Sequence, residues 1–191
     1  MIIGITGGTG CGKTTALQAF RELGGITLDC DEIYHRLLAT DQSLLDAIDR
    51  RFPGTVSGGE LDRKKLGTIV FGDKNALCDL NTITHSAVKK EVLLQIDGVS
   101  AHIAIDAIGL FEGGLAPLCD CTVAITAPEE SRVRRLIQRE NIPEAYARAR
   151  IQAQRSDDDF IAFCDHHLQN DGTQEDFHRK CLAFFGTLGI I

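Results

Sequence analysis

The run Gly-Gly-Thr-Gly-Cys-Gly-Lys-Thr at positions 7–14 constrains the fold of this chain more than any other feature. It fits the pattern G-x-x-x-x-G-K-[ST] without a mismatch. Residues 2–6 before it form an apolar run that indicates a buried strand, and residues 13–23 after it carry apolar side chains on one helical face. A strand, a glycine-rich turn and a helix N-terminus in this order form a cradle that binds phosphate groups.

Each residue type in this cradle has a physical role. Glycines let the backbone turn tightly, so that successive N–H groups point inward. Lys13 is expected to reach the β- and γ-phosphates of a nucleotide, and the Thr14 hydroxyl is expected to ligate Mg²⁺. A glycine-rich turn that binds nothing is the alternative, and the flanking strand and helix argue against it. The residues predicted to bind ATP here are Gly8, Thr9, Gly10, Cys11, Gly12, Lys13, Thr14 and Thr15, with Cys11 as a space-filling side chain.

Strands alternate with helical stretches along the chain. Short apolar runs predict five strands, at about 2–6, 26–28, 102–105, 121–125 and 167–168. The segment between the second and third strands contains no convincing strand and predicts four helices, at about 32–38, 43–52, 62–71 and 73–96. A second helical excursion runs from 129 to 163, with a break near 141–143. This order favours an α/β fold of the P-loop NTPase type, with a parallel five-stranded sheet flanked by helices.

Charge and composition exclude several classes of function. The formal net charge of -7 disfavours general binding to nucleic acid or to an anionic membrane. Residues 131–155 nevertheless hold seven of the thirteen arginines and only two glutamates, which suggests a small anionic ligand. The sequence has no apolar run long enough to span a bilayer, no export signal and no C-x-x-C pair for zinc, so we expect a cytoplasmic protein with reduced thiols.

The layout indicates a small-molecule kinase. The chain lacks the N-K-x-D tetrapeptide with which G proteins bind guanine, and it is short for a motor ATPase. In a kinase of this layout the helical insertion holds the phosphate acceptor, and the arginine-rich segment closes over the phosphates. We therefore expect a single domain over 1–191, in which the core covers about 1–35, 99–138 and 160–191, the acceptor-binding insertion about 36–98, and the lid about 139–159.

Eight segments spread over the whole length together resemble the dephospho-coenzyme A kinase family. They are I-G-I-T-G-G-T-G-C-G-K-T-T at the start, L-D-C-D-E-I-Y-H at 28–35, G-E-L-D-R-K-K-L-G-T-I-V-F at 59–71, L-N-T-I-T-H at 80–85, D-A-I-G-L-F-E at 106–112, R-L-I-Q-R-E-N at 135–141, R-A-R-I-Q-A-Q at 148–154 and C-D-H-H-L-Q-N-D-G at 164–172. The chain departs from the family pattern at Ile108, Gly109 and Ser86, and it lacks the lysine that usually follows the lid glutamine.

The resemblance implies ATP-dependent phosphorylation of the ribose 3′-hydroxyl of dephospho-CoA, giving CoA and ADP, the last step of coenzyme A biosynthesis. ATP and dephospho-CoA would be the small-molecule partners, with Mg²⁺ as cofactor and with neither nucleic acid nor membrane involved. Two alternatives stay open: another small nucleotide or nucleoside kinase of this architecture, and a nucleotide-binding regulatory protein with reduced turnover.

The resemblance also implies catalytic roles. It places Asp31 opposite the acceptor hydroxyl as the proton acceptor. It also makes Arg139 the lid arginine that bridges the oxygens of the transferring phosphate, and Lys13 of the cradle is the third residue with a catalytic role. The alternative for Asp31 is that it is an aspartate that only caps a helix before Glu32. The other arginines of this region, Arg134, Arg135, Arg148 and Arg150, are most simply explained as a solvated helix face.

The acceptor site is expected to contain Asp31, His85, Asp106, Phe111 and Glu112. Asp106 ends an apolar strand, the usual place of the acidic residue that holds a water of the Mg²⁺ shell, although it could simply belong to a turn. Phe111 could instead serve only in packing. His85 could instead be a hydrogen-bonded surface residue near the start of a helix. Asn170 is expected near the adenine by resemblance, or else simply in a turn before glycine.

Overall fold

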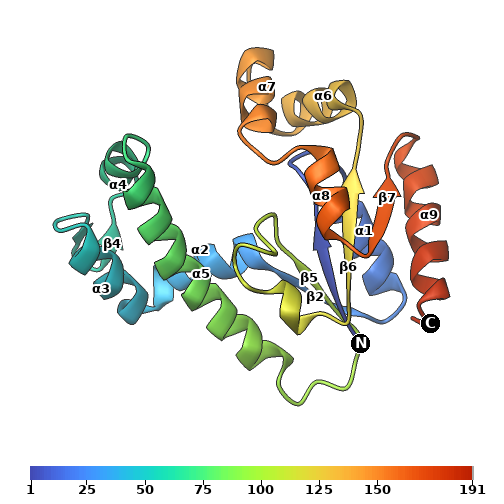
Figure 1. Cartoon of the computed structure of the whole chain (residues 1–191), viewed down its shortest axis with the longest axis horizontal. Helices are drawn as coiled ribbons and strands as arrows, with labels where there is room; N and C mark the ends of the chain where they lie inside the picture. Colours follow the sequence, from blue (N-terminus) through green and yellow to red (C-terminus); the bar gives the residue numbers. More distant parts are fainter. Residues whose placement is uncertain (191) are drawn as a thin grey trace. The chain divides into compact units, whose positions relative to one another are not determined.

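The computed structural model describes residues 1–190, which divide into two compact units (Figure 1). Within the described residues, unit 1 comprises 1–28, 100–110 and 116–190, and unit 2 comprises Asp29–Val99 and Phe111–Leu115. The boundaries predicted for core, insertion and lid stay predictions.

Unit 1 is built on a parallel sheet, which confirms the predicted fold class. Its strands are β1 (Ile2–Thr6), β2 (Ile26–Asp29), β5 (Ile103–Asp106), β6 (Cys121–Thr126) and β7 (His166–Gln169). Their order across the sheet is β2-β5-β1-β6-β7, with β1 paired in parallel to both β5 and β6. The central strands are apolar along nearly their whole length because both faces of the sheet are covered.

One face of the sheet is covered by two helices, α1 (Lys13–Glu22) and α9 (Gln174–Thr187), which also contact each other. Phe20 of α1 and Phe185 of α9 are both fully buried, and their rings meet edge to face with centroids 5.1 Å apart. The sequence analysis did not predict α9, although Thr173 and Asp176 form a capping box that marks its first turn.

The arginine-rich excursion consists of three helices rather than two. They are α6 (Glu129–Glu140), α7 (Glu144–Gln152) and α8 (Asp157–Phe163). The predicted break near 141–143 is confirmed, and it centres on Asn141, which ends α6 with a φ of 52°. A second break, which was not predicted, precedes Ser156, where a capping box starts α8. Helices α6 and α7 lie beyond the carboxyl end of β6 (Figure 1).

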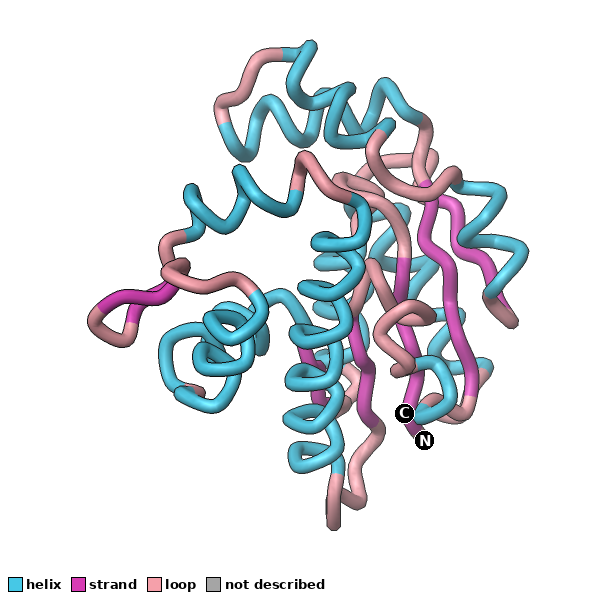
Figure 2. The backbone as a smooth tube through the Cα atoms, turned by 60° about the vertical axis from the view of Figure 1, so that its left-hand side comes forward, coloured by secondary structure: helices cyan, strands magenta, loops and turns pink. Residues whose placement is uncertain are grey.

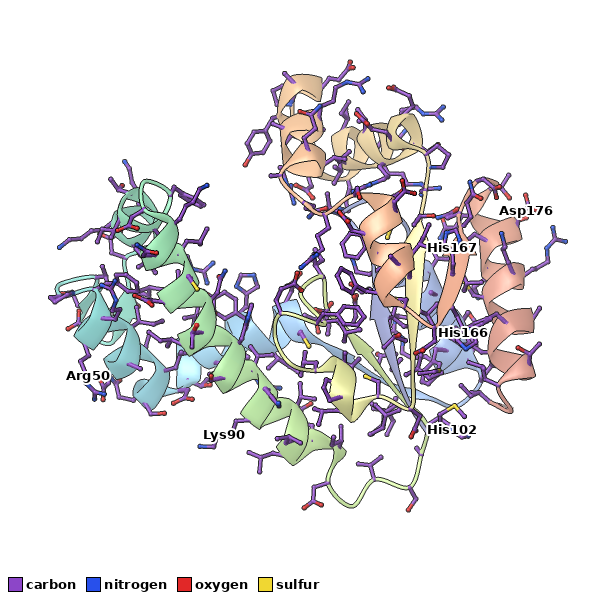
Figure 3. All side chains as sticks on the ribbon, viewed as in Figure 1. Arg50, Lys90, His102, His166, His167 and Asp176 are labelled. Atoms are coloured by element: carbon purple, nitrogen blue, oxygen red, sulfur yellow. The ribbon has the colours of Figure 1, made fainter. Side chains whose placement is uncertain are left out.

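The edge strand β7 directs successive side chains to opposite faces of the sheet (Figure 3). The ring of His166 meets Phe184 of α9 with centroids 5.3 Å apart. The next residue, His167, places Nε2 2.7 Å from the Thr126 hydroxyl on β6. The pairing with β6 continues one residue past β7, where the Asn170 N–H donates to the Thr126 carbonyl at 2.8 Å.

Unit 2 is a helical assembly around one long helix. Helix α5 (Lys74–Ile96) contacts α2 (Cys30–Thr40), α3 (Gln42–Arg51) and α4 (Arg63–Val70). An aspartate side chain caps the start of each of these four helices: Asp29, Asp41, Asp62 and Asp73. Within residues 1–190 no helix, α5 included, is both long enough and apolar enough to cross a bilayer.

A small hairpin in unit 2 shows that the prediction of no strand in this segment is wrong (Figure 2). Strands β3 (Val56–Ser57) and β4 (Glu60–Leu61) pair in antiparallel fashion. The two residues between them, Gly58 and Gly59, have φ values of 62° and 82°, which suit the tight turn of a hairpin. The strands escape prediction because two residues are too few to show an alternating pattern.

Candidate active site

The predicted phosphate cradle joins β1 to α1 and leaves the start of α1 open to a ligand. Gly12 precedes α1 with a φ of 110° and without a side-chain cap, unlike the aspartate-capped helices of unit 2. A Cβ atom at this position would lie 2.3 Å from Nδ2 of Asn170, so only glycine fits. An uncapped helix N-terminus presents N–H groups and positive potential, which together favour an anion.

Three consecutive carbonyl groups of the loop accept hydrogen bonds from side chains outside it. The pairs are Thr9 with Nε of Arg132 at 2.9 Å, Gly10 with Nη1 of Arg135 at 3.1 Å, and Cys11 with Nδ2 of Asn170 at 2.8 Å. A carbonyl group and the N–H group that follows it lie in the plane of the trans peptide and point in opposite directions. Binding these carbonyls therefore fixes the directions of the Gly10 and Gly12 N–H groups, which can hold phosphate oxygens, while the Cys11 N–H donates to the Gly8 carbonyl at 3.3 Å.

Lys13 and Asp106 lie together at the carboxyl edge of the sheet. The Lys13 ammonium donates a hydrogen bond to the Gly7 carbonyl at 3.0 Å, and its Nζ lies 4.0 Å from Oδ1 of Asp106. Both side chains are largely buried, so the charges act in a medium that screens them less than water does. Asp106 thus ends β5 next to the cradle, as its sequence position predicted.

The donor set at this edge suits Mg²⁺. Asp106 contributes carboxylate oxygens and Thr14 contributes a hydroxyl on the first turn of α1, both hard oxygen ligands. Among residues 1–190 no three His, Cys, Asp or Glu side chains gather into a metal cluster. Mg²⁺ that binds with nucleotide phosphates usually takes only one or two protein ligands, so the residues present fit this ion.

Cys11 occupies the hydrophobic core beneath the loop. Its side chain is fully buried among apolar residues of β1, α1 and α9. Burial raises the pKa of the Cys11 thiol, although the charge of Lys13 opposes this effect, so the thiol stays protonated near neutral pH. These properties agree with the predicted space-filling role.

The structure brings Arg132 and Gln154 to the loop and pairs Arg132 with Asp157, and none of these three residues had a predicted role. Arg132 has a residue exposure of 4%, and it shares the buried face of α6 with Val133 and Leu136. That pattern is a usable signal, because a charged residue in an apolar stripe must have a partner. The identity of the partner is set by tertiary contacts that the helical pattern does not contain.

Arg135 and Asn170 form a second contact to the loop. Nη2 of Arg135 donates to Oδ1 of Asn170 at 3.1 Å, and Arg135 is only partly exposed. The solvated-face interpretation is therefore wrong for Arg135. It suits Arg134, which is exposed and donates to Glu130 and Ser131 of its own helix, while Arg148 forms surface ion pairs with glutamates of α6 and α7. The predicted contact of Asn170 with adenine stays a prediction.

Comparison with known proteins decides the family. The dephospho-CoA kinase family model matches residues 1–176. The chain belongs to the dephospho-CoA kinase family. A dephospho-CoA kinase of Mycobacterium tuberculosis is 36% identical over 192 residues, which cover 97% of this chain and 46% of the relative. The chain therefore spans about half the length of this curated relative.

Two solved structures are similar to this chain over nearly its whole length, and one of them is a dephospho-CoA kinase. The crystal structure of TT1252 from Thermus thermophilus is 32% identical with a TM-score of 0.82, and the match covers 98% of this chain and 97% of that one. Dephospho-CoA kinase from Campylobacter jejuni is 25% identical with a TM-score of 0.68, over 98% of this chain and 96% of that one. The resemblance inferred from the eight sequence segments is thus confirmed.

The lid arginine predicted from the dephospho-CoA kinase pattern lies at the end of α6. Arg139 is exposed, and its Nη2 lies 2.5 Å from Oε1 of Glu140, which also pairs with Arg150. The Glu140 carboxylate has a lowered pKa because it accepts hydrogen bonds from these two arginines, Arg139 first. The role of Arg139 toward a transferring phosphate stays a prediction.

Asp29, the last residue of β2, and Asp31, in the first turn of α2, have different roles in the structure. Oδ1 of Asp29 accepts hydrogen bonds from the N–H groups of Asp31 at 2.9 Å and Glu32 at 3.1 Å, so Asp29 is the helix cap. Asp31 lies on the first turn of α2 with its side chain exposed. The capping alternative therefore applies to Asp29, and the carboxylate of Asp31 is available for the role that the dephospho-CoA kinase pattern implies.

The other residues predicted at the acceptor site, apart from Asp106, belong to unit 2. His85 lies in the interior of α5 rather than near its start and is partly exposed, so the alternative of a surface residue stays open. Phe111 is partly exposed and Glu112 is exposed, in the loop after β5, where the Gly114 N–H donates to the Phe111 carbonyl at 3.0 Å. Their contacts with an acceptor stay predictions.

Proposed function

We propose that this chain catalyses the ATP-dependent phosphorylation of the ribose 3′-hydroxyl of dephospho-CoA, producing CoA and ADP. The bond between the γ-phosphorus and the oxygen that bridges to the β-phosphate breaks, and a bond to the 3′-oxygen forms. The hydroxyl proton passes to a base. The observation that carries this proposal is the phosphate-binding loop, whose Thr9, Gly10 and Cys11 carbonyls are bound by side chains, in a chain that matches the dephospho-CoA kinase family over residues 1–176.

Electrostatic positioning supplies most of the proposed catalysis, as is usual for phosphoryl transfer. The loop N–H groups and the start of α1 hold the β-phosphate, and Lys13 reaches between the β- and γ-phosphates. Arg139 is proposed to contact the γ-phosphoryl oxygens, whose charge its planar guanidinium can bridge with two parallel hydrogen bonds.

Thr14 is proposed to hold Mg²⁺ directly, and Asp106 is proposed to hold it through a water. When bound, this ion neutralises charge on the β- and γ-phosphate oxygens. Lys13 lies beside Asp106, so the cation and the carboxylate keep each other oriented toward the same edge of the sheet.

Asp31 is proposed to accept the proton of the 3′-hydroxyl. Support comes from the division of roles after β2, where Asp29 caps α2 and leaves the Asp31 carboxylate exposed. His85, Phe111 and Glu112 are proposed to bind other parts of the acceptor. We place the reaction in the cytoplasm, where ATP is available.

An acceptor panel tests the proposal. ADP release is measured with purified protein, ATP and Mg²⁺, first without acceptor and then with dephospho-CoA, adenosine, AMP or shikimate. We expect ADP release that depends on dephospho-CoA and is at least a hundredfold slower with the others, because a site that hydrogen-bonds a specific acceptor strongly rejects analogues. Preference for another acceptor would indicate a different small-molecule kinase, and nucleotide binding without turnover would indicate a regulatory protein.

A further inference from the structure

A buried guanidinium contacts the outer side of the phosphate-binding loop. Arg132 projects from α6 with 5% of its side chain exposed. Its Nε donates to the Thr9 carbonyl at 2.9 Å, and its Nη1 lies 3.0 Å from Oδ1 of Asp157. The loop and Arg132 are far apart in the sequence, so this contact is formed only by the folded chain.

A glutamine completes the contact from the other side of the same residue. Oε1 of Gln154 accepts the Thr9 N–H at 2.7 Å and lies 3.4 Å from Nη2 of Arg132. Because both neighbours of this atom are N–H donors, the orientation of the amide is determined. Both backbone polar groups of Thr9 are thereby bound by side chains, so the dihedral angles of Thr9 cannot change without breaking a hydrogen bond.

The guanidinium of Arg132 packs directly against the backbone of the loop at Gly8. A Cβ atom on Gly8 would lie 2.1 Å from Nη2 of Arg132, and Thr9 is 7% exposed. The guanidinium is therefore in direct contact with the loop backbone. In a close-packed interior a shift of one member displaces its neighbours.

Asp157 supplies the charge that lets Arg132 stay buried. Burial raises the pKa of the Asp157 carboxyl, and the positive charge of Arg132 opposes that effect. Burying a cation without a partner costs a large free energy of desolvation. The ion pair therefore keeps the Arg132 guanidinium in place and does not by itself add affinity for a nucleotide.

We propose that Arg132, Gln154 and Asp157 form a positioning unit, which fixes the Thr9 peptide and thereby sets the loop N–H groups in the geometry that binds the β-phosphate of the donor. The inference rests on the proposed function, because it takes the loop to be the site of the nucleotide phosphates. The three side chains act through the loop backbone, on the side opposite to the bound phosphate.

The test compares two variants of the unit with two matched controls. Arg132→Met removes the group that donates to the Thr9 carbonyl, and Gln154→Leu removes the group that accepts from the Thr9 N–H. Both substitutions change the side-chain volume little. Arg134→Met and Gln152→Leu make the same changes at exposed positions on α6 and α7. The dissociation constant for ADP is measured by calorimetry at a temperature where circular dichroism shows each variant folded. KM is measured for ATP and for dephospho-CoA.

We expect the dissociation constant for ADP and KM for ATP to rise roughly tenfold or more in both variants of the unit, with KM for dephospho-CoA unchanged and both controls like the wild type. A purely structural role would lower the melting temperature while folded protein kept its ADP affinity, and that result would overturn the proposal. If Arg132→Met fails to fold, Gln154→Leu decides alone, and wild-type ADP affinity in that variant overturns the positioning unit.

The same measurements separate this inference from the proposed function. Wild-type protein that binds ADP without phosphorylating dephospho-CoA contradicts the proposed function, while the ADP comparison still decides whether the positioning unit exists. A positioning unit that passes the ADP test with normal turnover of dephospho-CoA supports both.

Discussion

Nζ of Lys13 lies 4.0 Å from Oδ1 of Asp106, on two elements that the sheet order brings together. Strand β1 leads through the loop into Lys13, and Asp106 ends the neighbouring strand β5, paired opposite Ile5. The carboxyl ends of parallel strands meet at one edge of a sheet, where ligands gather in open α/β folds. This pair is the part of the proposed site in which the cation for the phosphates and the carboxylate for Mg²⁺ are already adjacent.

Replacing Lys13 by alanine is expected to abolish transfer and leave the fold intact. Among residues 1–190 the ammonium contacts the Gly7 carbonyl and Asp106, and Lys13, although largely buried, is not part of the hydrophobic core cluster around α1 and α9. We expect kcat to fall by roughly 10²–10³ or more, since preorganised contacts to developing charge have effects of this size. Steady-state kinetics and thermal melting check this, with Lys90→Ala at an exposed position as the control. Near wild-type turnover in Lys13→Ala would show that the loop does not hold the transferred phosphate.

The roles of Asp29 and Asp31 can be separated by parallel substitutions. Asp31→Asn keeps the shape and removes the charge, so kcat should fall by roughly 10²–10⁴ while the melting temperature stays unchanged. Asp29→Ala removes the helix cap, so the melting temperature should fall by roughly 2–4 °C, the shift produced by about 1 kcal/mol in a domain of this size. A stable Asp31→Asn variant with a full rate would move the base elsewhere, with Asp106 as the first candidate.

Arg139→Lys is expected to be costly although the charge is kept. An ammonium cannot reproduce the planar fork that bridges phosphate oxygens, and this contact should strengthen as charge develops. We expect kcat to fall more than the affinity for ATP, measured by steady-state kinetics and calorimetry, with Arg134→Lys as the exposed control. Loss of ATP affinity alone would make Arg139 a ground-state anchor, and no change at all would assign it to the solvated surface.

The sequence was sufficient for the parts of the site that are contiguous. Strand, glycine turn, Lys13 and helix follow one another within a single motif, so local chemistry predicts the cradle and, with strand alternation, the parallel sheet. The family followed from several such segments together. The loop partners could not be predicted in the same way, because helical periodicity shows that Arg132 faces inward and does not show that it meets Thr9.

The exact start and end of short helices and strands were the other feature that the sequence did not predict. The D-x-D segment after β2 allows either aspartate to cap α2, and the assignment changes with a helix start that shifts by one or two residues. The hairpin around Gly58 and Gly59 has strands of two residues each, for which side-chain alternation has no statistical weight. In both cases the backbone hydrogen bonds decide what the side-chain pattern leaves open.

Acid destabilisation should be traceable in part to Asp165. Its Oδ2 accepts hydrogen bonds from both the hydroxyl and the N–H of Thr122, at 2.8 Å each, and these bonds lower the pKa of the carboxyl below its ordinary value of 3.8. A folded pKa below the unfolded one means that the stabilisation is complete above the unfolded value and is lost as pH falls through the folded value.

Asp165 is exposed, so solvent screens much of this effect, and we expect Asp165→Asn to lower the melting temperature by only roughly 1–2 °C at pH 7, the shift produced by about 0.5 kcal/mol. The difference from the wild type should shrink as the pH falls below about 4. Thermal melting across this pH range checks the prediction, with Asp97→Asn at an exposed position as the control. A difference that stays constant with pH would show that the charge of Asp165 does not contribute to stability.

The most direct test of the proposed kinase activity is the position of the phosphate in the product. Purified protein is incubated with ATP, Mg²⁺ and dephospho-CoA, the new phosphate is located by phosphorus–proton correlation in NMR, and ADP is quantified in the same sample. The account predicts a phosphate on the ribose 3′-oxygen and an equal amount of ADP, with formation of both dependent on dephospho-CoA. A phosphate at another position, or ADP release that does not depend on dephospho-CoA, would contradict it.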